Sequence, residues 1–510
     1  MGILVTPVLL RSQLSAYDGG LALTLARFLE PGRLPYRDLW TLYGPGPPIL
    51  GSMIMSLFGP GLGPQRVFQV LVHAGIVAAT YLVARRYVTG WVAAALAAMT
   101  AAVAAPIHFQ QTIALLLWGL WFLLRAGDDL ARAPRRLNVA ALLFGLSFWG
   151  RYEFVLVGPA LVVGLAIWLR GRIDDRHRRR ILWIGLTPPA LFVAYLLGVV
   201  GPERAWLNLV EYPFLRYPDG ACRGLPGSWG AALRALAAPL RGSAWTANEL
   251  VLWTATFLPP VLGAVCLAAA AGDRRARSLR MYVAAAVGAI SILLWLEHRP
   301  RASASPDALV PLIALSAAVA LGALARRNRI AARWASAATV SVVALTLVTS
   351  SVPASVRAWT DWPSYHPKLA WEGQRVEGLY DEVVWSRVAS VVRARTQPEK
   401  GIFVALTDNR RHHANAPIFY WFADRPPASR FVEFNPCLTD TAEVQRAIVA
   451  DLAGVDVVIA TTFFVDTRPS SGTGASVLDE YLRSRFQPVY RGELPQDQAV
   501  IVLERRQAPR

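Results

Sequence analysis

Two carboxylates near the start of the chain, Asp18 and Asp38, are the first candidates for chemistry. They lie in residues 15–48, which read SAYDGGLALTLARFLEPGRLPYRDLWTLYGPGPP. This is a long segment near the start of the sequence that is neither an apolar run nor a basic turn. An ionisable group held among apolar segments is costly and is a functional candidate for that reason. A carboxylate in such a place can accept a proton from a reacting group.

Each of these carboxylates also has a structural interpretation. Asp18 precedes two glycines and a short predicted helix, and it could cap that helix by accepting hydrogen bonds from its free N–H groups. Asp38 directly follows Arg37, and it could pair with that arginine or cap the next turn. The catalytic and structural interpretations are both open on sequence position alone.

Three arginines are candidates for binding an anionic group: Arg151, Arg299 and Arg301. The first lies with Glu153 in the middle of an otherwise apolar stretch. The other two belong to a Glu-His-Arg-Pro-Arg segment between two further apolar runs. A guanidinium at the edge of an apolar segment can bind a phosphate in fork geometry, although a polar turn would explain both places too.

The spacing of His, Cys, Asp and Glu gives no metal motif. Asp408 with His412 and His413 is a weak cluster that a solvated loop explains better. We therefore expect no protein metal site, while a divalent cation that arrives with a substrate stays open.

The elements around these residues are those of a membrane protein. Of 510 residues, 54% are hydrophobic and 17% are charged. A bilayer is crossed by about 20 apolar residues, so we expect a polytopic protein with about 10 to 11 transmembrane helices. The first apolar run is too short to span, and surface helices are expected at 21–29 and 49–58. The clearest spans are 67–84, 91–105, 112–124, 139–150, 154–168, 181–200, 250–271, 281–296, 308–325 and 334–352.

The net charge of +18 is concentrated in alternate connections between these spans, such as residues 170–180, RGRIDDRHRRR. The positive-inside rule assigns such connections to the cytoplasm, and the pattern argues against nucleic-acid binding. Heavy use of Arg and Ala is typical of a high-GC bacterial genome, so a bacterial inner membrane is expected. The segments predicted to be extracytoplasmic are 15–48, 151–153, 202–248, 297–307 and the C-terminal domain. Cys222 and Cys437 both lie in these segments, where they could form a disulfide or remain two unrelated thiols.

The last part of the chain alternates predicted helices and strands. Such alternation argues for an α/β domain, and no Gly-rich phosphate loop follows a strand. We expect a transmembrane domain at 1–354 and an extracytoplasmic α/β domain at 355–510. The predicted helices are 380–395, 441–452 and 476–486, and the predicted strands are 401–406, 455–459 and 499–503. A cap is expected at Thr439-Asp440, just before the second helix.

These motifs together resemble the polytopic C-type (GT-C) glycosyltransferases. The first-loop Asp, the short helix, Pro-Tyr-Arg-Asp at 35–38 and Gly-Pro-Gly-Pro-Pro at 44–48 resemble their first loop. The segment with Gly145-Leu146 and Gly150-Arg151-Tyr152-Glu153 is also similar to theirs. Within the superfamily, the resemblance is to bacterial members similar to protein O-mannosyltransferases and the lipid A aminoarabinose transferase. It covers about residues 1–352, and the tail resembles that of some uncharacterised bacterial members.

The resemblance implies a hexosyl- or pentosyltransferase that takes a sugar from a polyprenyl-phosphate carrier. The acceptor would be an envelope glycan, lipid or protein outside the membrane, and membrane lipids would surround the enzyme. Asp18 matches the first-loop base, although Gly19 stands where the family often has a second acid, and Asp38 could assist. The three arginines above would bind the donor phosphate. Residues placed to contact substrate are Tyr17, Arg37, Tyr43, Glu153 and His298.

Two other function classes remain. A transporter or scramblase of a lipid-linked or anionic substrate would use arginines near the membrane and the Pro188-Pro189 pair, but no internal repeat supports it. A catalytically silent scaffold that presents the α/β domain is compatible with the glycine after Asp18.

Overall fold

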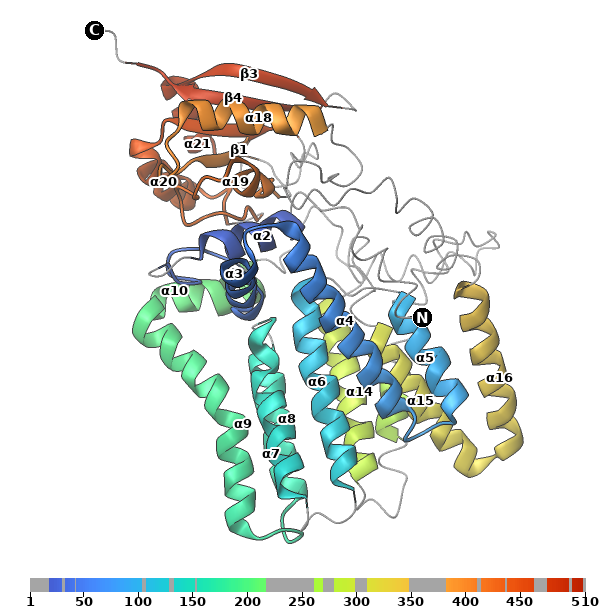
Figure 1. The fold of residues 1–510 in the computed structure, drawn as a ribbon. Helices are drawn as coiled ribbons and strands as arrows, with labels where there is room; N and C mark the ends of the chain where they lie inside the picture. The colour runs from blue at the N-terminus through green and yellow to red at the C-terminus, as the bar shows by residue number, and fades with distance from the viewer. Residues whose placement is uncertain are drawn as a thin grey trace. The chain divides into compact units, whose positions relative to one another are not determined.

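The computed structural model of this chain is mostly α-helical, with a small β-sheet domain near the C-terminus (Figure 1). This architecture confirms the predicted fold class. The structure describes residues 18–29, 33–41, 43–102, 107–127, 133–151, 154–216, 261–268, 279–298, 310–347, 382–410, 414–435, 438–462, 475–494 and 498–507.

The chain divides into two compact units. The first, here called the helical unit, comprises Met1–Arg11, Arg66–Val193 and Pro226–Tyr365. The second, here called the loop–sheet unit, comprises Ser12–Gln65, Ala194–Leu225 and His366–Arg510. The opening loop therefore clusters with the C-terminal domain. The boundary predicted between residues 354 and 355 lies outside the described residues and stays a prediction.

Apolar helices coincide with each predicted span that the structure describes. The span predicted at 250–271 is described only at 261–268, which is helical. Within the described residues, three helical segments are long and apolar enough to cross a membrane: Leu62–Ala84, Asp175–Val200 and Val310–Arg327. The helices are α4 Leu62–Ala84, α5 Gly90–Ala102, α6 Ile107–Ala126, α7 Pro134–Gly145, α8 Phe154–Trp168, α9 Asp175–Tyr195, α14 Leu279–His298, α15 Val310–Arg327 and α16 Arg329–Thr346.

Small residues allow these helices to pack closely. A Cβ added at Gly145, the last residue of α7, would lie 2.1 Å from the carbonyl oxygen of Gly185 in α9. A Cβ at Gly158 in α8 would lie 2.1 Å from the carbonyl oxygen of Phe144. Glycine is enriched where membrane helices approach backbone to backbone. The Gly145 motif noted in the sequence therefore has a packing role between α7 and α9.

Basic connections of the helical unit meet at one end of the bundle. The hydroxyl of Tyr87, between α4 and α5, donates to the Arg280 carbonyl at the start of α14 (2.8 Å). A Cβ at Gly322, near the end of α15, would lie 2.8 Å from the Tyr87 carbonyl oxygen. Figure 1 shows the last turn of α6, the first turn of α7 and the α8–α9 and α15–α16 connections at this same end. This arrangement agrees with the sequence pattern, in which alternate connections between spans are basic and were predicted to lie on one side of the membrane.

The opening loop has a helix at both places where a surface helix was predicted, and the first of the two is largely buried. They are α2, Asp18–Phe28, and α3, Gly46–Phe58, which has proline in its first turn. α3 exposes Met53, Leu57 and Phe58, the last at 71%. An exposed apolar face of this kind is typical of a helix that lies along a membrane surface.

The sheet of the C-terminal domain has the order β1-β2-β4-β3. β1 pairs with β2 in parallel, and β4 is antiparallel to both of its neighbours. An α/β domain was predicted and is confirmed. The strands are β1 Phe403–Leu406, β2 Val457–Thr461, β3 Phe486–Leu494 and β4 Gln498–Arg505, and the helices are α18 Glu382–Arg395, α19 Ile418–Ala423, α20 Ala442–Asp451 and α21 Val477–Arg485.

Local differences from the prediction have physical causes. β3 was missed because Pro488 and Gly492 interrupt its pattern, and an edge strand tolerates both. α19 was missed because its six residues, IFYWFA, are all buried and show no helical period. The cap predicted at Thr439-Asp440 was wrong: Thr441 caps α20, and its hydroxyl accepts from the Val444 N–H at 3.4 Å.

Asn415 provides a test of the C-terminal domain's packing. It is fully buried, donates to the carbonyls of Val404 and Val432 (3.2 Å each) and accepts from the Phe434 N–H (3.1 Å). Each buried polar group left unsatisfied costs about 1–3 kcal/mol. Asn415→Ala is expected to lower the unfolding free energy by about 3 kcal/mol in denaturant titrations followed by fluorescence.

Asn415→Asp is the matched comparison, because it keeps the acceptor for the Phe434 N–H while an oxygen replaces the amide nitrogen that faces two carbonyls. We expect a loss at least as large as that of the alanine variant, because a buried carboxylate would then face those carbonyls without a donor. An alanine variant as stable as the wild type would contradict the bridging role of Asn415.

Candidate active site

The helix that begins at Asp18 is fixed to the C-terminal domain within the loop–sheet unit. Leu21, Leu25 and Phe28 of α2 are almost completely buried, in one apolar cluster with residues of α19. The Thr24 hydroxyl donates to the Pro417 carbonyl (2.7 Å), just before α19. Arg27 at the other end of α2 pairs with Asp424 (3.0 Å). The C-terminal domain therefore determines where the backbone of Asp18 lies.

Gly20 is required for this close approach. A Cβ built at Gly20 would lie 2.6 Å from both the Cβ and the backbone nitrogen of Ile418. Because backbone atoms cannot move aside as a flexible side chain can, α2 can touch α19 only with glycine here. Gly20 thus has a packing reason, whereas the missing family acid was predicted at the preceding glycine, Gly19.

The Pro-Tyr-Arg-Asp segment forms a strained turn. Tyr36 is fully buried with φ of 65°, which is uncommon for a residue other than glycine. Its N–H donates to the Leu39 carbonyl (2.8 Å) and its hydroxyl to the Tyr43 carbonyl (2.6 Å). The Tyr195 hydroxyl donates to the Pro35 carbonyl (2.6 Å). Such backbone outliers cost about 1–3 kcal/mol and cluster at functional sites, because surrounding contacts hold them in place.

Asp38 is ion-paired within this turn. Its Oδ2 accepts from Arg37 Nη2 (2.7 Å), from Arg37 Nε (2.9 Å) and from the Leu34 N–H (2.9 Å). Partial burial acts to raise the pKa of the Asp38 carboxyl. The hydrogen bonds from Arg37 and Leu34, with the charges of Arg37 and Arg204, outweigh burial and lower that pKa below its ordinary value. Asp38 is therefore held as a carboxylate and orients Arg37.

Two further arginines lie beside this turn. Arg204, in the short helix α10 (Pro202–Trp206), donates to the Arg37 carbonyl (3.2 Å), and its charge acts on both Asp38 and Arg430. The Arg430 carbonyl accepts from the Trp40 N–H (2.8 Å), and its guanidinium lies over the Phe431 ring (4.6 Å). Arg37, Arg204 and Arg430 are called the arginine cluster below.

One member of the arginine cluster, Arg430, is half-buried and lies near another cation. Burial lowers the pKa of Arg430, and the charge of Arg204 acts in the same direction, against the opposing charge of Asp451. Arg430 Nη1 is buried and has no hydrogen-bond partner among the described residues. A buried guanidinium nitrogen without an acceptor, close to a second cation, is an arrangement that a bound anion would stabilise.

A buried amide adds a second polar group near the cluster. Asn208 is 1% exposed, and neither its Oδ1 nor its Nδ2 has a partner within the described part of the chain. It lies in η4 (Leu207–Arg216), a π-helical segment of a kind that often occurs at functional sites. The preceding residue, Leu207, packs against the apolar cluster that contains Trp40 and Phe431.

The chain is similar to known proteins in sequence profile and in fold. The sequence profile described as dolichyl-phosphate-mannose-protein mannosyltransferase matches residues 43–197. The crystal structure of ArnT from Cupriavidus metallidurans bound to undecaprenyl phosphate aligns with a TM-score of 0.53 at 15% identity, over 98% of this chain and 96% of that chain. The chain has the fold of the GT-C glycosyltransferases.

Other solved structures align with lower scores. The Archaeoglobus fulgidus oligosaccharyltransferase gives a TM-score of 0.49 at 14% identity, over 90% of this chain and 68% of that chain. The arabinofuranosyltransferase AftD from Mycobacteria gives 0.45 at 15% identity, over 98% and 41%. No curated protein sequence matches the chain.

The structure distributes the predicted site residues of this GT-C fold unevenly. It brings Arg37, Asp38 and Tyr43 together in the loop–sheet unit, which also contains the start of α2 at Asp18. Arg151 is half-buried and belongs to the helical unit. The remaining candidates lie outside the described residues, entirely or by their side chains: Tyr17, Glu153, His298, Arg299 and Arg301.

The other sequence-level candidates are partly described. No group of three or more His, Cys, Asp or Glu side chains that could hold a metal ion occurs in the described residues. Cys222 and Cys437 lie outside them. Sequence reasoning missed Arg204 and Arg430, which are distant from the turn in sequence. The only local signal was a charged pair, Glu203 and Arg204, directly after the end of a predicted span.

Proposed function

We propose that this protein is an integral-membrane glycosyltransferase that moves a hexosyl or pentosyl group from a polyprenyl-phosphate carrier to an acceptor. The observation that carries the proposal is the loop–sheet unit, in which the helix of Asp18 and the arginine cluster belong to one compact body. The GT-C fold and the undecaprenyl phosphate bound by the ArnT relative support the choice of donor.

The reaction has two needs that these residues meet. A hydroxyl or amine of the acceptor attacks the anomeric carbon, Asp18 takes its proton, and the bond from that carbon to the phosphate oxygen breaks. The polyprenyl phosphate leaves with the bonding electron pair, and its growing negative charge requires preorganised cations. The arginine cluster supplies them in this proposal, with Asp38 holding Arg37 in place. Arg151, Arg299 and Arg301 remain sequence-based candidates for the same phosphate.

The proposed location is a bacterial inner membrane, with the opening loop and C-terminal domain on the extracytoplasmic side. The alternation of basic and charge-poor connections supports this orientation. The proposed acceptor is a cell-envelope glycan, lipid or protein, and a mannosyltransferase-like activity fits the matched family profile.

The direct test is transfer of a labelled sugar by the purified protein in proteoliposomes, with a panel of polyprenyl-phosphate sugars and acceptor extracts. We expect labelled acceptor to form from at least one donor. Flipping of the labelled lipid without any transfer would instead establish the transporter or scramblase class.

Removing a charge from the arginine cluster is expected to weaken donor binding. Hydrogen bonds to charged groups contribute about 1.5–3 kcal/mol, so Arg204→Gln and Arg430→Gln should each raise the KM for the donor about tenfold or more. Transfer rates measured against donor concentration provide this value. Arg446→Gln, at an exposed position on α20, is the matched control and should leave the KM unchanged. An unchanged KM in both cluster variants would remove the cluster from the donor site.

A further inference from the structure

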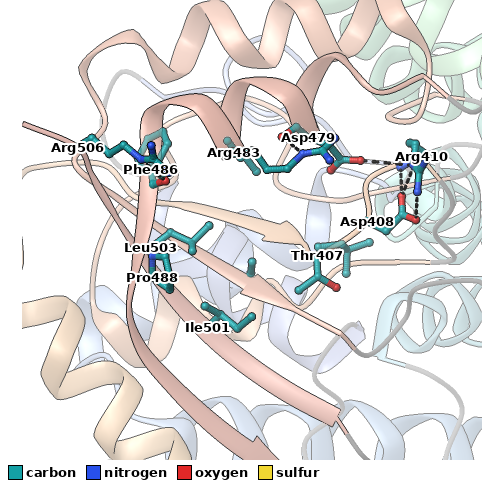
Figure 2. Close-up of a pocket in the computed structure, with 13 residues that line it drawn as sticks. Thr407, Asp408, Arg410, Asp479, Arg483, Phe486, Pro488, Ile501, Leu503 and Arg506 are labelled. Carbon is teal, nitrogen blue, oxygen red and sulfur yellow. Dashed lines mark hydrogen bonds and ion pairs between the residues drawn. The ribbon is translucent and has the colours of Figure 1, made fainter. Parts of the chain in front are cut away.

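The C-terminal domain contains a cavity that the reaction above does not use. Its volume is about 410 Å³, within the range of small-molecule sites. Figure 2 shows its lining residues, which come from the end of β1, from α21 and from strands β3 and β4. The cavity lies wholly within the loop–sheet unit.

The floor of the cavity is apolar because of strand alternation. Ile501 and Leu503 are two residues apart on β4 and therefore point to the same face of the sheet. Val500 and Val502, between and beside them, are buried in the domain core. Pro488 of the neighbouring strand β3 completes the floor. The sheet thus presents an accessible apolar strip on the side away from that core.

One side of the cavity carries two carboxylates. Asp479 of α21 accepts from the N–H and Nδ2 of Asn409 (3.0 and 2.7 Å). Asp408 accepts from Arg410 Nε and Nη2 (2.9 and 2.8 Å), and that guanidinium lies 3.8 Å from Asp479. Burial raises the pKa of Asp479. The hydrogen bonds from Asn409 and the charge of Arg410 act against this rise, whereas the charge of Asp408 adds to it. Carboxylate oxygens with several lone pairs can accept further hydrogen bonds from hydroxyl groups.

Two anchored arginines also line the cavity, Arg483 beside Asp479 and Arg506 at the end away from the carboxylates (Figure 2). Arg483 Nε donates to the Asp479 carbonyl (3.2 Å), and Arg506 Nε donates to the Phe486 carbonyl (3.1 Å). Both residues are exposed, and their Nη atoms have no hydrogen bond or ion pair in the part of the chain that the structure describes. A guanidinium fixed at Nε with free Nη groups can bind a carboxylate or phosphate.

We propose that this cavity binds an acidic sugar residue of the acceptor, one that carries a carboxylate or a phosphate. The apolar face of the sugar ring lies on Ile501 and Leu503, and its hydroxyls donate to Asp408 and Asp479. Its anionic group is bound by Arg506, and Arg483 lies between that group and the carboxylates. The assignment to an acceptor rests on the glycosyltransferase function proposed above, whereas the binding chemistry does not.

The test is saturation-transfer difference NMR on the full-length protein in nanodiscs, with glucuronic acid and glucose as matched probes. We expect clear saturation transfer to glucuronic acid and at least tenfold less to glucose. Glucose 6-phosphate is expected to behave like the acid. The double variant Arg483→Gln/Arg506→Gln should reduce the signal of the acid to that of glucose.

Arg485→Gln is the control, because Arg485 is an exposed arginine on the same helix that does not line the cavity. It should bind glucuronic acid as the wild type does. Equal signals from the acid and the neutral sugar, or undiminished binding by the folded double variant, would overturn the proposal.

The sugar-binding test and the assay of the proposed transfer reaction can fail independently of each other. Glucuronic acid binding that persists in Asp18→Asn supports the cavity whatever the transfer assay gives. Transfer by a wild type that does not distinguish the two sugars would overturn the cavity assignment and leave the glycosyltransferase function standing.

Discussion

Replacement of Asp18 by asparagine is expected to lower the rate of sugar transfer by about a hundredfold or more. General base catalysis contributes about 10²–10⁴-fold, and an amide cannot take the proton of the acceptor. Asparagine is nearly isosteric with aspartate and is accepted at the beginning of a helix, so α2 should keep its position. The measurement is kcat with saturating polyprenyl-phosphate sugar in proteoliposomes.

The KM for the donor distinguishes a base from a binding residue. If Asp18 acts on the acceptor's proton, Asp18→Asn lowers kcat while the donor KM changes little. Glu203→Gln, at an exposed acid of α10 in the same unit, is the control and should retain full activity. Wild-type kcat in Asp18→Asn would remove Asp18 from the mechanism.

Asp38 is the second candidate carboxylate, and its contacts suit a different role from the one proposed for Asp18. Its lowered pKa and its hydrogen bonds to Arg37 suit a residue that orients a cation, and they make it a poor base. In the proposed mechanism Asp38 therefore affects donor binding through Arg37, whereas Asp18 affects the chemical step.

Much of the fold was predictable because its signals are local. Long apolar runs and basic turns locate the membrane helices, and short apolar runs locate β1, β2 and β4. β3 escaped because proline and glycine within FQPVYRGEL are typical of turns. Its partner β4 is the next strand along the chain, so the pairing is local and the missed signal was that of β3 itself.

The candidate site was predictable only in its local part. Asp18 and the Arg37–Asp38 pair were recognisable, because unusual polar groups stand out beside apolar helices. Arg204 and Arg430 were not, since each lies in an ordinary surface-like segment of sequence. Folding brings them beside the turn: Arg204 donates to the Arg37 carbonyl, and Trp40 donates to the Arg430 carbonyl.

Gly20 has a role that the sequence does not reveal. The missing family acid was predicted at the preceding position, Gly19, and that stays a prediction. The structure gives Gly20 a contact with Ile418, through which the opening loop and the C-terminal domain form one compact unit. The C-terminal domain is, in this respect, part of the framework of the candidate active site.

Gly20→Ala is therefore expected to disable transfer although it removes no reacting group. The new Cβ would lie 2.6 Å from the backbone nitrogen of Ile418, so α2 and α19 must separate. Overpacking of this kind costs about 1–3 kcal/mol. Asp18 is only two positions away, and a displacement of about 1 Å at a reacting group can cost about 10²-fold in rate. We expect a comparable loss in kcat and a lower Tm in thermal unfolding.

Gly454→Ala is the matched control, since a Cβ there meets no atom within 4 Å in the same unit. It should keep wild-type activity and stability. A second variant tests whether a smaller partner side chain relieves the crowding: adding Ile418→Ala to Gly20→Ala leaves the Cβ, Cα and backbone nitrogen of residue 418 in place. It should therefore not restore transfer. Wild-type kcat and Tm in Gly20→Ala would mean that contact with α19 does not position the candidate base.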